Sequence, residues 1–322
     1  MLLKEKAKIH FIGIGGIGMS GIAEVLLNLG YNVSGSDVAE GKNVMKLKSL
    51  GAHISIGHQT ENIQDHTVVV YSSAIDFQNP EIVETLKKKI PLIKRAEMLS
   101  ELMRDKFGVA IAGSHGKTTT TSMLATILHE SKIDPTHIIG GIVSNLSGHA
   151  KVGKSKYLIA EADESDGSFL MLNPILCTIT NIDNDHLDYY KTVENLENAF
   201  IKFANRIPFY GVCTFNAHDP VMRRLKSKIK RPWKTFGIRA EGDEKADYEA
   251  SNIIDSNNGS KFDLHFKGEQ VAQMNISLPG KHNVLNALGA ISLAHGLGLS
   301  FSEIEKSIEC FRGVDRLSLI HI

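Results

Sequence analysis

The sequence has few cysteines, and their placement excludes two kinds of site. Cys177, Cys213 and Cys310 are odd in number and far apart. A disulfide framework needs an even number of cysteines, and a cysteine metal site needs close spacing. We therefore expect each cysteine to be a small buried apolar residue, in a protein of the reducing cytoplasm.

The chain also lacks an excess of charge and any long apolar run. Lys and Arg number 36 together, as do Asp and Glu. No overall attraction to nucleic acid or to an acidic membrane is therefore expected, and any anion site must be local. No stretch approaches the ~20 apolar residues of a membrane helix, and there is no repeat or low-complexity tract. Residues 1–8 are basic, but a strand-like run and a glycine loop follow them, which disfavours a cleavable signal peptide.

The fold class follows from length and from the alternation of strand-like and helix-like segments. A chain of 322 residues exceeds one ordinary core, which predicts two domains. Short apolar strands alternate with amphipathic helices, as in α/β folds built on parallel sheets. We expect a Rossmann-like domain over residues 1–105 and a phosphate-loop ATPase-type α/β domain over residues 106–316.

Residues 107–122 are the most informative stretch of the chain. An apolar run that predicts a buried strand ends at Gly113, and a helix-like segment follows Thr118. A glycine loop between a strand and a helix can turn several backbone N–H groups towards one phosphate. Lys117 would then reach the terminal phosphates, and Thr118 would offer its hydroxyl to Mg²⁺.

This loop is shorter than the usual phosphate-binding pattern. Gly113 and Gly116 are separated by two residues instead of four, so an ordinary turn with a surface lysine is the alternative. The four threonines at 118–121 argue for the phosphate site. Because β-branched residues are poor helix formers, their presence in a first turn indicates that their hydroxyls are needed there.

A second glycine loop lies near the start of the chain. Residues 13–18 have the pattern Gly-x-Gly-x-x-Gly between a strand and a helix, and Asp37 follows Gly18 by 19 residues. The pattern is typical of a nucleotide diphosphate site, with the acid on a ribose hydroxyl. Close packing of strand and helix without a ligand is the alternative. Ser72 and Ser73 follow a later strand and would line the same crevice, unless they are plain turn residues.

Acidic and histidine residues follow two strands of the second domain. Four acids lie within residues 161–166, directly after a strand, and Glu161 is expected to lie deepest. Beside a phosphate loop they favour Mg²⁺ binding over a solvated turn. His186, among carboxylates after another strand, is a candidate metal ligand or acid–base group, or else a structural histidine.

A polar cluster precedes the last long helix. His282, Asn283 and Asn286 lie at the predicted start of that helix. Residues of this kind often cap a helix. They can equally form hydrogen bonds with an adenine or a ribose.

In this order, the motifs resemble those of the Mur ligase family. Five segments carry the resemblance: residues 13–24, 112–120, 161–166, 185–188 and 280–286. It runs from about residue 8 to Arg316, and the combination is highly specific.

The resemblance implies a role for each candidate residue. It assigns the UDP part of a sugar nucleotide, rather than NAD, to Gly13, Gly15, Gly16, Gly18, Met19, Ser20, Asp37, Ser72 and Ser73. It assigns ATP to Gly113, Ser114, His115, Gly116, Lys117, Thr118, Thr119, His282, Asn283 and Asn286. Thr118 and Glu161 would hold one Mg²⁺ ion and His186 would help hold a second. Lys117, Glu161 and His186 are the implied catalytic residues.

The implied activity is that of an ATP-dependent ligase in bacterial cell-wall precursor synthesis. The lactyl carboxylate of UDP-N-acetylmuramate would take the γ-phosphate of ATP, and L-alanine would displace phosphate from the acyl phosphate. Residues 13–24 favour L-alanine addition over murein tripeptide recycling or another step of the family. Two interpretations outside the ligases are an NAD-binding or nucleotide-binding module and an NAD-dependent oxidoreductase. The first leaves residues 161–166 and His186 without a role, and the second leaves residues 113–118 unexplained.

The sequence departs from the family pattern in two respects. The family has a third, Rossmann-like domain, whereas here the chain stops soon after Arg316 and residues 317–322 form an atypical tail. We therefore expect UDP-sugar binding, weak ATP binding and little or no ligation. Some family members carry a carbamylated lysine at the metal site, and no matching lysine can be assigned. The oligomeric state is left open.

Overall fold

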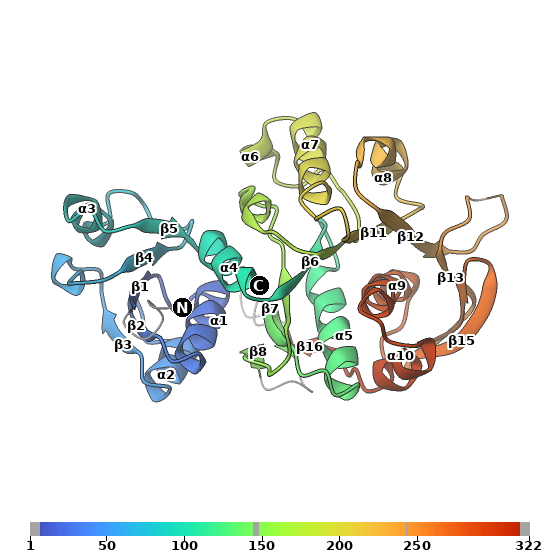
Figure 1. The fold of residues 1–322 in the computed structure, drawn as a ribbon, viewed down its shortest axis with the longest axis horizontal. Helices are drawn as coiled ribbons and strands as arrows, with labels where there is room; N and C mark the ends of the chain where they lie inside the picture. Colours follow the sequence, from blue (N-terminus) through green and yellow to red (C-terminus); the bar gives the residue numbers. More distant parts are fainter. Residues whose placement is uncertain (1–6, 144–147, 243, 316–322) are drawn as a thin grey trace. The chain divides into compact units, whose positions relative to one another are not determined.

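The computed structural model describes residues 7–143, 148–242 and 244–315. The predicted tail over 317–322 and its neighbour Arg316 lie outside these residues. The chain forms two compact units: residues 1–102 with 149–152, and residues 103–148 with 153–322. Each unit is built on its own sheet (Figure 1).

The first unit holds a five-stranded sheet with the order β3-β2-β1-β4-β5, and all its strands are parallel. The strands are β1 (Lys8–Ile12), β2 (Asn32–Asp37), β3 (His53–Ile56), β4 (Val68–Tyr71) and β5 (Leu92–Lys94). The helices are α1 (Ile17–Asn28), α2 (Lys42–Ser49), η2 (Thr60–Asn62), α3 (Pro80–Lys87) and α4 (Arg95–Arg104). This is the expected Rossmann-like arrangement.

Local sequence explains how this unit begins. Phe11 and Ile12 of β1 are fully buried, as are Ile22 and Ala23 of α1, so strand and helix share one core. Gly30, at φ +85°, follows the C-cap residue Leu29 and ends α1. The strand order reverses direction between β1 and β4, and ligands of open α/β sheets bind outside the carboxyl ends of the strands at such a point.

The second unit has a larger sheet, with the order β15-β14-β13-β12-β11-β10-β6-β9-β7-β16. Its strands are β6 (Phe107–Ala112), β7 (Thr136–Val143), β9 (Tyr157–Glu161), β10 (Leu176–Ile179), β11 (Val212–Asn216), β12 (Trp233–Ile238), β13 (Tyr248–Ser256), β14 (Gly259–Phe266), β15 (Glu269–Ile276) and β16 (Val314–Asp315). Along this order, all neighbouring strands from β13 to β7 are parallel. The pairs β13–β14, β14–β15 and β16–β7 are antiparallel. The short strand β8 (Gly148–Lys151) lies at the division between the units.

Helices cover both faces of this larger sheet (Figure 1). They are α5 (Lys117–Glu130), η3 (Ser168–Met171), α6 (Leu187–Tyr190), α7 (Val193–Ala204), α8 (Pro220–Leu225), η4 (Lys226–Lys228), α9 (Lys281–Gly296) and α10 (Phe301–Ile308). Apolar side chains of α5 and α9 share one buried core, which includes Leu124, Ile127, Leu288 and Ile291. Because α5 and α9 pack in this shared core, their amino ends lie together at the carboxyl ends of the parallel strands.

The sequence at residues 257–260, Asn-Asn-Gly-Ser, predicts a hairpin turn. The structure has this hairpin, because β13 and β14 pair antiparallel on either side of the turn. Residues 223–231 are rich in basic side chains and predict a surface helix, but the helix found there, α8, is shorter and begins earlier, at Pro220. Asp219 accepts a hydrogen bond from the Met222 backbone N–H, and a proline in the first turn also favours this earlier start.

The cysteines of β10 and β11 are neighbours. Cys177 and Cys213 are register partners on these adjacent parallel strands, and both are fully buried. Cys310 is half-buried. The expected burial therefore holds for the two strand cysteines.

Candidate active site

A glycine loop joins β6 to α5, and its tight packing explains the two glycines. Gly113 and Gly116 have φ values of +133° and +82°. A Cβ on Gly113 would lie 2.0 Å from Thr180 Oγ1, and one on Gly116 would lie 2.2 Å from Asn286 Oδ1. Only glycine fits at either position. Gly116 is the N-cap of α5 and provides no side-chain capping hydrogen bond, so an anion can bind to the N–H groups at this helix end.

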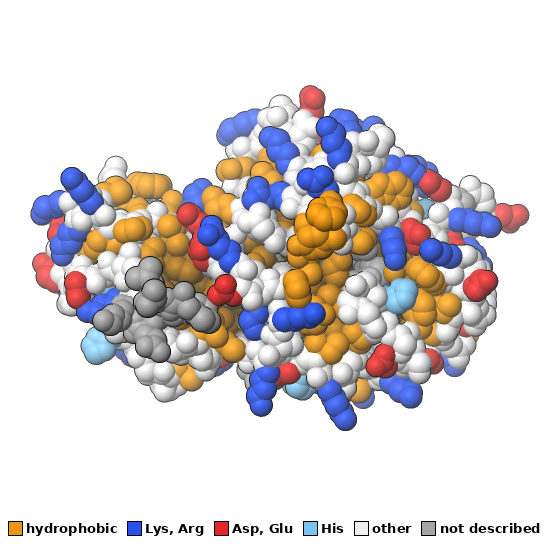
Figure 2. All heavy atoms as spheres, in the orientation of Figure 1, with side chains coloured by type: hydrophobic (Ala, Val, Ile, Leu, Met, Phe, Trp, Pro, Cys, Tyr) orange, Lys and Arg blue, Asp and Glu red, His pale blue; other side chains and the backbone are white. Residues whose placement is uncertain are grey.

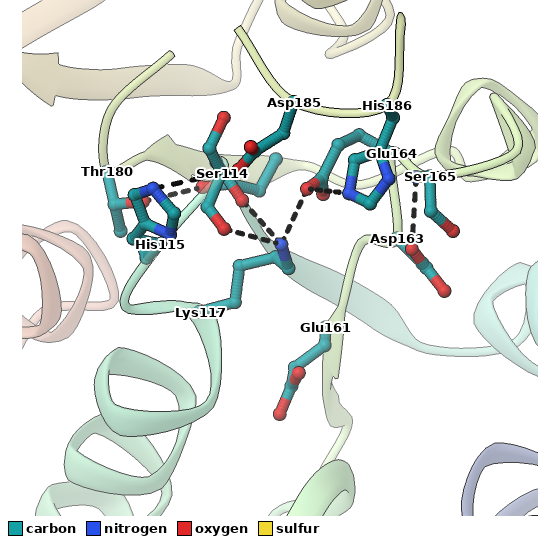
Figure 3. A network of polar contacts seen from close by, with 12 residues as sticks. Ser114, His115, Lys117, Glu161, Asp163, Glu164, Ser165, Thr180, Asp185 and His186 are labelled. Atoms are coloured by element: carbon teal, nitrogen blue, oxygen red, sulfur yellow. Dashed lines mark hydrogen bonds and ion pairs between the residues drawn. The ribbon is translucent and has the colours of Figure 1, made fainter. Parts of the chain in front are cut away.

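The loop is held by residues that follow β10. Asn181 Oδ1 accepts a hydrogen bond from the His115 backbone N–H at 2.9 Å, and the Asn181 carbonyl accepts one from the Ser114 N–H at 3.1 Å. Thr180 Oγ1 donates to the His115 carbonyl at 2.6 Å (Figure 3). Thr180 and Asn181 are site residues that sequence reasoning missed. The available signal was their place directly after a strand that neighbours β6.

Lys117 extends back over this loop. Its Nζ donates to the carbonyls of Gly113 and Ser114, at 2.6 and 3.3 Å, and to Glu164 Oε1 at 2.7 Å. Figure 3 shows the ammonium directed towards Ser114 and Glu164. The lysine is thus positioned at the loop, where the sequence predicts the terminal phosphates.

Thr118 and Glu161 lie together at the end of β9. Thr118 Oγ1 donates to Glu161 Oε2 at 3.1 Å, and the Gly140 N–H donates to Glu161 Oε1 at 2.7 Å. Burial raises the pKa of Glu161. A hydroxyl and a carboxylate oxygen at this separation suit Mg²⁺, which prefers oxygen ligands and keeps phosphate and water oxygens as well. Within the described residues, no group of three or more His, Cys, Asp or Glu side chains is placed to hold a metal ion, so any cation here would depend on phosphate or water oxygens.

A second acid after β9 also lies in the site. The Glu164 side chain is 1% exposed. The chain turns after β9, and Tyr190 Oη donates to the Glu164 carbonyl, which fixes Glu164 beneath the loop. His186, the N-cap of α6, has its Nε2 3.6 Å from Glu164 Oε1. His186 therefore lies next to Glu164 and Lys117 (Figure 3).

A cavity of about 300 Å³ opens beside the loop. It is lined by His115, Gly116, Thr119, Thr180, Asn181, Asn216, His282, Asn283, Leu285 and Asn286. The three polar residues predicted near the start of α9 thus line one cavity next to the phosphate loop. Helix capping does not explain them, because the N-cap of α9 is Gly280. Sequence reasoning missed Asn216 and Leu285.

The glycine loop of the first unit is also held by its own backbone contacts. The N–H groups of Gly13 and Ile14 donate to the Ser36 carbonyl at 2.9 and 3.0 Å. Asp37 Oδ2 accepts from the Gly15 N–H at 2.8 Å, and a Cβ on Gly15 would lie 2.9 Å from that oxygen. The carboxylate of Asp37 therefore contacts the loop, while its predicted ribose contact stays a prediction.

Other predicted residues of this loop differ in exposure. Met19 and Ser20 are buried, and Ser20 Oγ donates to the Ile17 carbonyl. Ser72 lies against Gly13, and Ser73 is exposed after β4. Arg95, which the sequence analysis did not select, lies so close to Gly18 that a Cβ there would be 3.1 Å from its guanidinium. A cation at this helix start suits an anionic ligand, and its place just after β5 was the available signal.

Comparison with models of protein families identifies the family of this chain. The family model described as "Mur ligase family, catalytic domain" matches residues 8–107, and the one described as "Mur ligase middle domain" matches residues 111–294. The chain belongs to the Mur ligase family. This confirms the resemblance inferred from its motifs.

Individual Mur ligases agree with this assignment. The chain is 49% identical over 308 residues to UDP-N-acetylmuramate–L-alanine ligase of Syntrophotalea carbinolica, covering 96% of this chain and 66% of that protein. It is 50% identical over 316 residues to the enzyme of the same name from Endomicrobium trichonymphae, covering 98% and 69%. The chain thus spans about two thirds of the length of these curated relatives.

Two solved Mur ligase structures share the fold. UDP-N-acetylmuramate–alanine ligase from Thermotoga maritima matches with a TM-score of 0.83 and 32% identity, over 96% of this chain and 69% of that one. A UDP-N-acetylmuramate:L-alanyl-γ-D-glutamyl-meso-diaminopimelate ligase from Neisseria meningitides matches with a TM-score of 0.87 and 26% identity, over 96% and 99%. The two-unit fold is therefore that of Mur ligases, as predicted.

None of the helices among the described residues is long and apolar enough to cross a bilayer. On the face shown in Figure 2, basic and acidic side chains are interspersed, in keeping with their equal numbers.

Proposed function

We propose that this chain supplies the sugar-nucleotide and ATP sites of a UDP-N-acetylmuramate–L-alanine ligase. The observation that carries the proposal is the site at the carboxyl ends of β6 and β9. There a phosphate loop, Lys117 and the Thr118–Glu161 pair lie beside a cavity lined by polar residues. The relatives with 48–50% identity support L-alanine as the amino acid, and a cytoplasmic location fits such substrates.

The chain's own residues account for the phosphate chemistry. The lactyl carboxylate oxygen attacks the γ-phosphorus, the bond to the bridging oxygen breaks, and ADP leaves. Lys117 and the N–H groups at the start of α5 stabilise charge on the transferred phosphoryl group. A Mg²⁺ ion held by Thr118 and Glu161 would neutralise further phosphate charge. The amine of L-alanine then attacks the acyl carbon, phosphate leaves, and the amine loses a proton.

The first unit would bind the sugar nucleotide. Its glycine loop precedes α1, whose amino end suits the diphosphate, and Arg95 lies beside that end. We propose that Gly13, Gly15, Gly16 and Gly18 allow close approach of the UDP group. His282, Asn283 and Asn286 would contact the base or ribose of ATP in the second unit.

A binding experiment tests this function. Calorimetric titration with UDP-N-acetylmuramate and with NAD, separately, should show binding of the first alone. Titration with MgATP should show binding that Lys117→Ala weakens by about tenfold or more, since a charge-assisted phosphate contact is lost. Lys202→Ala, which removes an exposed lysine of α7, is the matched control and should bind like wild type. Binding of NAD without the sugar nucleotide would contradict the proposal.

A second candidate is a murein tripeptide ligase. The Neisseria structure, with a TM-score of 0.87 over 99% of that chain, favours this alternative. Both candidates use UDP-N-acetylmuramate, so the sugar-nucleotide titration does not separate them. Amino-acid competition does: L-alanine should reduce trapping of the acyl phosphate by hydroxylamine, whereas the tripeptide should not.

A further inference from the structure

Glu164 lies at the centre of the phosphate site, and the function proposed above gives it no role. Its Oε1 accepts from Lys117 Nζ at 2.7 Å and lies 3.6 Å from His186 Nε2. The side chain is 1% exposed. Its backbone is fixed, because the Glu164 carbonyl accepts a hydrogen bond from Tyr190 Oη at 2.5 Å. Glu164 is thus a rigidly placed carboxylate in contact with the loop lysine.

The second oxygen of this carboxylate has no partner. Glu164 Oε2 is buried and makes no hydrogen bond with any described residue. Glu161 differs, since Thr118 and Gly140 contact one carboxylate oxygen each. Leaving a buried carboxylate oxygen unpaired is costly unless a ligand or a cation meets it. The unpaired oxygen therefore indicates that Glu164 does more than support the fold.

Glu164 and a phosphate oxygen would compete for the N–H donors of Lys117. An ammonium has three N–H donors, and Lys117 Nζ has three acceptors: the carbonyls of Gly113 and Ser114, and Glu164 Oε1. A phosphate oxygen must displace one of them. Because the Glu164 side chain is only 1% exposed, water screens its charge weakly, and the carboxylate would also repel a triphosphate. Both effects disfavour phosphate binding in the absence of additional positive charge.

We propose that Glu164 is a positioning residue that makes ATP binding depend on a divalent cation. It competes with phosphate for Lys117, and the cation that accompanies ATP offsets its charge so that Lys117 can turn to the phosphates. This inference rests on the proposed ATP site. It predicts that removing the charge of Glu164 strengthens binding of metal-free nucleotide.

Calorimetry of wild type and Glu164→Gln tests the inference. The titrant is the non-hydrolysable ATP analogue AMPPNP, once with Mg²⁺ and once with EDTA. In EDTA, Glu164→Gln should lower the Kd by about tenfold or more, since it removes both the repulsion and the competition. With Mg²⁺ the change in Kd should be smaller. The ratio of the Kd in EDTA to the Kd with Mg²⁺ should therefore be lower in Glu164→Gln than in wild type. Glu194→Gln removes an exposed carboxylate of α7 and should leave both values unchanged.

Acetylation of Lys117 provides an independent measurement. Mass-spectrometric footprinting without nucleotide should show faster acetylation in Glu164→Gln, because the lysine loses its carboxylate partner. Should that variant unfold, Glu164→Asp replaces it: it keeps the charge and shortens the side chain, so acetylation should quicken while the dependence on Mg²⁺ remains.

The outcomes separate this inference from the proposed function. If wild type fails to bind AMPPNP with Mg²⁺, the proposed ATP site is wrong. If wild type binds but Glu164→Gln leaves the Kd in EDTA unchanged or raises it, Glu164 does not oppose phosphate and the inference is overturned. Unchanged acetylation of Lys117 in the folded variant would overturn it as well.

Discussion

Gly116 and Gly298 share a backbone conformation and differ in their surroundings. Both have positive φ, +82° and +99°. A Cβ on Gly116 would lie 2.2 Å from Asn286 Oδ1, whereas Gly298 has open space around it. The pair therefore separates the cost of backbone strain from the cost of disturbing the site.

We predict that Gly116→Ala weakens MgATP binding by about tenfold or more, because the methyl group displaces Asn286 and shifts the loop. Strain alone should cost each alanine variant roughly 1 kcal/mol of folding stability. Gly298→Ala, the matched control, should therefore lose stability and keep its affinity. Calorimetry and thermal unfolding of both variants check the prediction. Equal affinities would show that the fit of Gly116 against Asn286 has no part in binding.

Sequence reasoning selected those residues of the candidate site that occupy motif positions. Lys117, Thr118 and Glu161 were selected because a glycine loop and a strand end fix their neighbourhood. Glu164 was not selected, because the sequence does not indicate which of the four acids within residues 161–166 folds beneath the loop. Asn181 was missed for another reason. Its contact with His115 depends on the register of β10 against β6, which pairs Ile179 with Ala112, and register is not readable from either strand alone.

At the scale of elements, a buried polar network joins β1, β2 and α3 in the first unit. Glu81, in the first turn of α3, accepts hydrogen bonds from Ser36 Oγ at 2.6 Å and from Asn62 Nδ2 at 2.5 Å. His10 Nε2 lies 3.3 Å from the same carboxylate. Burial acts to raise the pKa of Glu81, but these hydrogen bonds outweigh it and lower the pKa. Because the Ser36 carbonyl also holds Gly13, the network supports the first glycine loop.

The stability of the first unit depends on pH through His66. Burial, and then the charge of His10, lower the pKa of His66 from 6.5 to about 4. The unfolded chain therefore takes up the proton first, and stability falls as pH drops from about 6.5 towards 4. The lowered pKa of Glu81 adds a further loss below about 4.5. Asp65 opposes the shift of His66, while Lys8 and Lys88 add to it.

We predict that hydrogen-exchange protection of β1 and β2, corrected for intrinsic rates, is lower at pH 5 than at pH 7. His66→Gln should reduce this difference, because the titrating ring is gone. His53→Gln removes an exposed histidine of the same unit and serves as the control. Part of the difference should persist, since burial also lowers the pKa of His149. A pH dependence that is identical in wild type and His66→Gln would contradict this account.

At the scale of the whole molecule, the two units repeat one local device. In each, a buried strand ends in a glycine loop that begins a helix: β1 and α1 in the first unit, β6 and α5 in the second. Alternating strands and helices made this predictable. The grouping of residues 149–152 with the first unit was not, because it depends on contacts between residues distant in sequence. The same holds for β16, which pairs with β7 from more than 160 residues away.

The neighbouring thiols of β10 and β11 have a consequence for measurement. Hydrogen bonding to Cys213 and burial both raise the pKa of Cys177, and both residues lie in the middle of the second sheet. The thiolate is the nucleophile that attacks a thiol reagent, so these two cysteines should react only when the sheet opens, and should react together. Half-buried Cys310 should be labelled earlier and mark the start of the reaction.

We predict that MgATP slows only the joint labelling of Cys177 and Cys213, since a ligand bound to the folded state reduces opening. Quenched labelling with mass spectrometry resolves the three sites, and separate rates for Cys177 and Cys213 would contradict the prediction. The labelling rates of these thiols thus report, without any added dye, on the opening of the second unit.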